Sequence, residues 1–132
     1  MNTKLLMAAS AMVMGVVGAA GLFAPHELLS ALGITATEPL PALVQLHGAL
    51  LFGFAMVNWM AKDSLIGGIY NRPVAVGNLM HFATGAITLV KLVMTGTKPM
   101  PILIATAIYT IFAIGFAMIV FGSPIKAAQP IN

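Results

Sequence analysis

Residues 41–61 read PALVQLHGALLFGFAMVNWMA, a run of 21 residues without a single Asp, Glu, Lys or Arg. About 20 predominantly apolar residues are enough for a helix to cross the hydrocarbon core of a bilayer. The proline that opens the run suits the first turn of a helix, where a missing backbone N–H costs nothing. The stretch therefore predicts a transmembrane helix.

Three further runs of similar length and composition lie on either side of it: Leu5–Ala24, Pro73–Met94 and Pro101–Phe121. The strand-like alternation of apolar and polar residues that a membrane barrel requires is absent. The predicted fold class is therefore all-α, an integral membrane four-helix bundle forming one domain over residues 1–132.

The overall composition agrees with that of an integral membrane protein. Of its 132 residues 60% are hydrophobic and only 7% are charged, and the mean hydropathy is +1.01. Soluble domains carry roughly a quarter charged residues. Cysteine is absent, which excludes a disulfide scaffold, and the six basic residues are scattered. The net charge of +3 reflects scarce acids rather than a basic patch, so nucleic acid is not an expected partner.

The first run has a second interpretation. Lys4, the apolar stretch after it and the small residues Gly18-Ala19-Ala20 are also typical of a cleaved secretory signal. The run is longer than the apolar core of most signals, which spans about 7–15 residues. We therefore expect a retained helix.

The distribution of basic residues predicts the orientation. Four of them fall at ends that a four-span topology places on one side: Lys4, Lys62, Arg72 and Lys126. Lys98 falls on the other side, and the connection after the first span carries only acids, Glu27 and Glu38. By the positive-inside rule both termini are expected in the cytoplasm, N-in and C-in.

The connections also carry structural signals. Leu28, Leu29 and Leu32 recur at helical spacing and Gly33 is a suitable C-terminal stop, which predicts a short amphipathic helix in the outer interface. The connection over 62–72 contains Gly67-Gly68 and is short enough to make the second and third spans antiparallel neighbours.

Polar residues inside the second and third spans are the candidates for a site, because they cost free energy in hydrocarbon. The candidate ligand-binding residues are Asn58, Asn78, His81, His47 and Thr88. They form a stripe on each span, which predicts that the two spans face each other or line a shared cavity. Asn58, Asn78 and His81 lie near the same membrane face, whereas His47 enters from the opposite face.

Two interpretations of these residues stay open. The asparagines and His81 are either hydrogen-bonding links between helices or the lining of a pocket for a lipid head group or a small polar ligand. Lys62 and Arg72 have a similar pair of interpretations, as contacts to anionic lipid head groups or as solvated loop residues.

Catalytic, metal and haem chemistry are not expected. By residue counting, His47 and His81 lie roughly 8–10 Å apart along the membrane normal, which disfavours one haem bound between them. Haem bound by a single histidine is a lesser alternative, and so is a quinone. No histidine pair has the i,i+4 spacing of a zinc site. All three acids, Glu27, Glu38 and Asp63, lie outside the spans, which disfavours proton-coupled transport and hydrolytic catalysis.

Several short motifs stand out along the first two-thirds of the chain: GLFAP at 21–25, LHGAL at 46–50, Asn58-Trp59, GGIYNRP at 67–73 and Asn78. Together they resemble the DoxX-like family of small bacterial membrane proteins. That resemblance implies four helices, a bacterial origin and a quinone-facing accessory role, because relatives of DoxX are linked to thiosulfate:quinone oxidoreductase as small membrane subunits.

The expected function is that of a non-enzymatic subunit or scaffold in the bacterial cytoplasmic (inner) membrane. It would hold lipid, quinone or another apolar molecule between the second and third spans, with membrane lipid and other membrane subunits or copies of itself as partners. The alternative is a small oligomeric permease or channel lined by the polar stripes. A third hypothesis is an enzyme subunit that touches quinone through His81.

Overall fold

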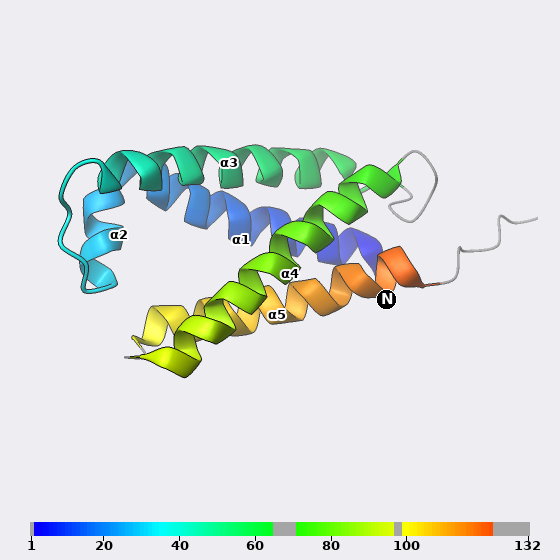
Figure 1. The fold of residues 1–132 in the computed structure, drawn as a ribbon. Helices are drawn as coiled ribbons and strands as arrows, with labels where there is room; N and C mark the ends of the chain where they lie inside the picture. The colour runs from blue at the N-terminus through cyan, green and yellow to red at the C-terminus, as the bar shows by residue number, and fades with distance from the viewer. Residues whose placement is uncertain (1, 65–70, 97–98, 123–132) are drawn as a thin grey trace, which may run out of the picture.

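The computed structural model describes residues 2–64, 71–96 and 99–122, and within these it contains five helices and no strand. Figure 1 shows them in order: α1 (Thr3–Phe23), α2 (Pro25–Ala31), α3 (Leu40–Ala61), α4 (Arg72–Thr95) and α5 (Met100–Phe121). All but α2 are long and apolar enough to cross a membrane. Their 21 to 24 residues correspond to about 32–36 Å of helix, against a core of about 30 Å. The prediction of an all-α bundle with four spans is confirmed, and the chain is a multi-pass membrane protein.

Proline and glycine mark the helix ends. A proline occupies the first or second position of each helix from α2 to α5. The predicted short helix after the first span is present as α2, and it ends where Gly33 adopts a φ of +72°. The N–H groups of Gly33 and Ile34 donate to the carbonyls of Ser30 and Leu29, each at 2.9 Å. This left-handed turn satisfies the last carbonyls of α2 and favours glycine at position 33.

Helices α1 and α3 pack with their backbones in contact. A Cβ atom added at Gly18 would lie 2.7 Å from the backbone nitrogen of Phe52, and one added at Gly48 would lie 2.8 Å from the carbonyl oxygen of Gly18. Gly21 faces the same stretch of α3. Lipid is as apolar as the side chains themselves, so moving a side chain from lipid to another helix gains little free energy. Helices in a membrane therefore associate through close backbone packing of this kind.

Helices α4 and α5 form the second pair, joined by aromatic rings. The ring of Tyr109 lies on Gly85, where an added Cβ would come within 2.5 Å of it. Phe82 stacks on Phe112 and Phe116, with ring centroids 4.8 and 5.7 Å apart. Phe82 and Phe116 are fully buried, and so is Met7 from α1, so the main apolar core lies where the two pairs meet.

The two pairs diverge. In Figure 1 the start of α4 lies close to the end of α3, and α4 then runs diagonally away from α3 toward the end of the molecule where α2 lies. The sequence predicted α3 and α4 as antiparallel neighbours, and they are neighbours mainly at one end, because α3 packs along its length on α1.

Charged side chains join α1 and α3 at that end. Lys4 Nζ lies 2.6 Å from Asp63 Oδ1, and Lys62 Nζ lies 3.5 Å from Asp63 Oδ2. Lys4, Lys62 and Arg72 therefore share one end of the bundle, here called the basic end. Their grouping agrees with the predicted topology. Gly67, Gly68, Lys98 and Lys126 lie outside the described residues, and the orientation in the membrane stays a prediction.

The ion pair of Asp63 makes a pH-dependent contribution that can be measured. The hydrogen bond from Lys4 holds the pKa of the Asp63 carboxyl below its usual range. A carboxyl whose pKa is depressed by folding stabilises the fold at neutral pH, and that contribution is lost as the pH falls below about 4. We expect Asp63→Asn to lose this part of the acid dependence in thermal unfolding scans between pH 3 and pH 7. The effect will be small, because the pair is exposed to solvent. An acid profile identical to that of the wild type would contradict this assignment.

Candidate functional site

Two asparagines form a closed amide pair between α3 and α4. Asn58 Nδ2 donates to Asn78 Oδ1 and Asn78 Nδ2 donates to Asn58 Oδ1, each at 2.7 Å. Both side chains are fully buried. Asn78 Nδ2 also donates to the carbonyl of Val74 at 2.9 Å. The sequence placed these residues at similar depth on facing helices, and the structure brings them together.

The network extends to a third helix through Ser10 of α1. Asn58 Nδ2 donates to Ser10 Oγ at 3.0 Å, and Ser10 Oγ donates to the carbonyl of Met7 at 2.9 Å. Ser10 is also fully buried. Among the described residues, no buried side-chain nitrogen or oxygen is left without a partner. The network therefore ties α1, α3 and α4 together at the basic end.

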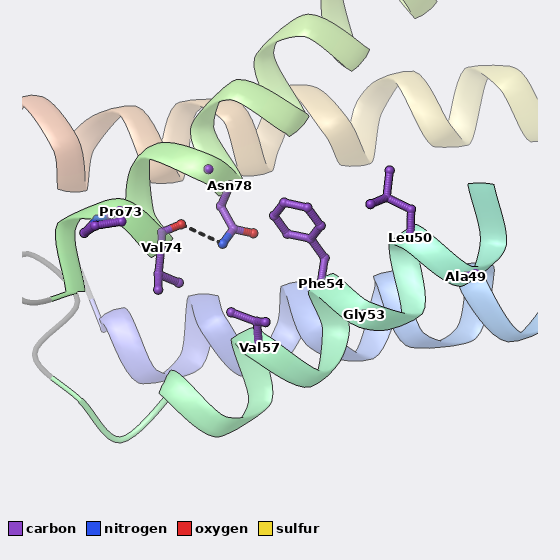
Figure 2. A pocket seen from close by; sticks show the side chains of 9 residues that line it. Ala49, Leu50, Gly53, Phe54, Val57, Pro73, Val74 and Asn78 are labelled. Carbon is purple, nitrogen blue, oxygen red and sulfur yellow. Dashed lines mark hydrogen bonds between the residues drawn. The ribbon is translucent and has the colours of Figure 1, made fainter. Parts of the chain in front are cut away.

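An open groove of about 470 Å³ runs along the gap between α3 and α4. Figure 2 shows Leu50, Phe54 and Val57 pointing from α3 toward α4, with Pro73 and Asn78 on the opposite wall. The complete lining is Ala49, Leu50, Gly53, Phe54, Val57, Pro73, Val74, Gly77 and Asn78. The second and third spans thus contact each other near one end and line an open groove, but Asn78 is the one candidate of the polar stripes in its lining.

The groove is apolar, although the sequence predicted a polar lining. Asn78 contributes the one polar side chain among the lining residues, and its amide is already bonded to Asn58 and Val74. Asn58 is buried behind the groove, not in its lining. The two asparagines of the stripes satisfy each other, because an unpaired polar group in a low-dielectric interior is costly. Their apolar neighbours are left to face the open space.

Glycine forms the floor of the groove on α3. A Cβ atom added at Gly53 would meet nothing within 4 Å. At Gly77 on the other wall, an added Cβ would lie 3.8 Å from Phe54 Cε1. The Ala49 and Gly53 pair has the spacing of a helix-packing motif, and here it faces open space rather than a neighbouring helix.

His81 is bonded to α5 and is not part of the asparagine network. Its Nε2 lies 3.1 Å from the hydroxyl of Tyr109. The His81 ring stacks on Phe54 with the centroids 5.6 Å apart, so Phe54 separates it from the groove. His81 therefore supports the groove wall from behind, through Phe54, rather than lining it.

The structure does not bring the remaining candidates into the groove. His47 is exposed on α3 and Thr88 is exposed on α4, where the hydroxyl of Thr88 donates to the carbonyl of Thr84 at 2.9 Å. Lys62 donates to the carbonyl of Trp59 at 3.2 Å and lies over the Trp59 ring. Arg72 is exposed at the first position of α4.

Sequence reasoning missed two residues of this region, because Ser10 and Tyr109 were not singled out. Ser10 carries a usable signal, because it falls at the spacing of the buried face of α1 together with Met7 and Met14. Within the part of the chain that the structure describes, no three His, Cys, Asp or Glu side chains gather as metal ligands.

Fold and site together define a multi-pass membrane protein with an apolar groove that opens sideways between two helices. The sequence matches no protein-family model, no curated protein and no solved structure.

Proposed function

We propose that the protein is a non-enzymatic membrane subunit or scaffold that holds an apolar molecule, such as a lipid or a quinone, in the groove between α3 and α4. The observation that carries this proposal is the groove itself, about 470 Å³ in volume and lined almost wholly by apolar side chains and glycine. Ligand sites are typically concave, mostly apolar and within the range of about 300–1,000 Å³.

Two further observations support a binding role. Gly53 and Gly77 leave open a space that larger residues would fill, and the groove walls belong to two separate helix pairs that meet at the asparagine network. The connections are short and no catalytic cluster was found in the sequence, which supports a subunit that serves other membrane proteins or copies of itself rather than acting alone.

We also propose the bacterial cytoplasmic membrane as the location, with the basic end facing the cytoplasm. The grouping of Lys4, Lys62 and Arg72 at one end supports this orientation through the positive-inside rule. The resemblance to DoxX-like proteins supports the bacterial origin.

The proposal is tested by filling the groove. In the Gly53→Leu variant the new side chain occupies the space in front of α3, so we expect the amount of co-purified lipid or other apolar molecule to fall several-fold in native mass spectrometry. The matched control is Ala107→Leu, which adds three side-chain carbons, one fewer than Gly53→Leu, at an exposed position of α5 outside the groove.

The measurement separates the hypotheses. Retention in the control and loss in Gly53→Leu support the groove as the binding site. Equal retention in both variants would overturn it. If neither the wild type nor the control retains any small molecule and solute flux appears in vesicles, the permease or channel alternative takes its place.

A further inference from the structure

The depth of the groove matches one leaflet of a bilayer. On α3 its lining runs from Val57, one turn before the helix end at Ala61, to Ala49 near the helix centre. These eight steps correspond to about 12 Å along the membrane normal, against about 15 Å for half of the hydrocarbon core. On α4 the lining begins at Pro73, the second residue of the helix. The groove therefore starts at the head-group level of the basic end and extends toward the bilayer midplane.

The interior of the groove suits a hydrocarbon chain rather than a polar head. Asn78 Oδ1 accepts from Asn58, and both protons of Asn78 Nδ2 are donated, one to Asn58 and one to the carbonyl of Val74. No donor of that amide is left for a ligand. A ligand group that needs a hydrogen-bond donor would lose its water in this space without gaining one from Asn78, which costs free energy. An acyl chain carries no such penalty.

An exposed basic residue lies at the end of α4 where the groove begins. Arg72 is exposed and directly precedes Pro73, a lining residue. Asp63 is the one acid of the sequence near this end, and Lys4 and Lys62 already neutralise it at 2.6 and 3.5 Å. Glu27 lies in α2 and Glu38 in the connection after it, at the opposite end of the bundle. Among the described residues Arg72 thus has no acidic partner.

From these three observations we infer that the groove takes one acyl chain of an anionic phospholipid from the leaflet at the basic end, with the lipid phosphate at Arg72. The inference rests on the proposed function and adds the class of the ligand to it. A guanidinium group is suited to this task because its fork of N–H donors matches the oxygens of a phosphate.

The test is a competition between two lipids that differ only in head group. Detergent-solubilised protein is offered equal amounts of phosphatidylglycerol and phosphatidylcholine with identical acyl chains, and the bound lipid is read by native mass spectrometry. We expect the wild type to prefer phosphatidylglycerol. In Arg72→Gln total retention will persist, and the preference will fall about fivefold, which corresponds to about 1 kcal/mol for one basic residue near an anionic surface.

Three control variants separate charge at the groove from charge in general. Arg72→Lys should restore part of the preference, because the charge returns without the fork geometry. Lys91→Gln removes a charge from the far part of α4 and should leave the preference unchanged. Gly53→Leu should abolish retention of both lipids, because it fills the groove itself.

The outcomes distinguish this inference from the proposed function. If the wild type retains both lipids equally, or if Arg72→Gln keeps the full preference, the anionic-lipid inference is overturned while the groove remains a binding site. If the wild type retains neither lipid and Gly53→Leu changes nothing, both ideas fail. Because Arg72 is exposed, its replacement should leave the helix content unchanged in circular dichroism.

Discussion

Replacing Gly48 by alanine will lower the free energy of unfolding by about 2–3 kcal/mol, although alanine is the better helix former. The added Cβ would lie 2.8 Å from the carbonyl oxygen of Gly18 and from the backbone nitrogen of Leu22, and 2.9 Å from the carbonyl carbon of Gly21. These atoms belong to backbone and cannot turn aside as a flexible side chain would. The whole of α1 must move away from α3, and the close packing that holds the two helices in lipid is lost.

The matched control is Gly53→Ala, the same substitution on the same helix. Its Cβ would meet nothing within 4 Å, so helix propensity alone should act and stabilise the protein by up to about 1 kcal/mol. Both variants are measured by equilibrium unfolding in mixed micelles of mild detergent and dodecyl sulfate. Equal stability of the two variants would show that α1 and α3 do not pack through Gly48.

The different surroundings of Gly48 and Gly53 could not be predicted from the sequence around them. Gly48 and Gly53 are five residues apart on one apolar helix, and about 140° apart around it. Each is a small residue that suits close helix packing, and only the direction in which α1 and α4 lie decides that one meets backbone and the other meets open space. Four spans and the short helix α2 could be predicted, because length, hydropathy, proline and glycine act locally. The choice of packing partner is not a local property.

The asparagine network was partly predictable, because part of it depends on local properties of the sequence. Depth along a helix follows from residue counting, so Asn58 and Asn78 could be placed together. The hydroxyl of Ser10 gives no signal of its own, because serine and threonine hydroxyls in helices commonly bond to their own backbone, as Thr84, Thr88, Thr106 and Thr110 do here. Only its spacing with Met7 and Met14 on the buried face of α1 indicates its role. The apolar lining of the groove follows in part from the network, because the Asn58 and Asn78 amides bond to each other, while His47, His81 and Thr88 lie outside the lining.

Removing one member of the amide pair will have the second large effect. In Asn58→Leu the oxygen Oδ1 of Asn78 loses its donor, while Asn78 Nδ2 keeps the carbonyl of Val74. In Asn78→Leu the oxygen Oδ1 of Asn58 loses its donor in turn. A buried acceptor left without a partner costs about 1–3 kcal/mol, which exceeds the average of about 0.6 kcal/mol for one hydrogen bond between membrane helices. We therefore expect each single variant to lose about 1–3 kcal/mol of unfolding free energy.

The double variant Asn58→Leu/Asn78→Leu decides between a linked pair and two independent residues. With both amides gone no acceptor is stranded, and two leucines of similar size can pack against each other, so the loss should be smaller than the sum of the single losses by about 1–2 kcal/mol. Independent residues would give additive losses, which would contradict the closed pair. Because Asn58 is buried between the helix pairs and is not part of the groove lining, the lipid preference expected from Arg72 should persist in an Asn58→Leu variant that remains folded. Loss of that preference in a folded Asn58→Leu variant would mean that the network positions the groove walls as well as joining the helices.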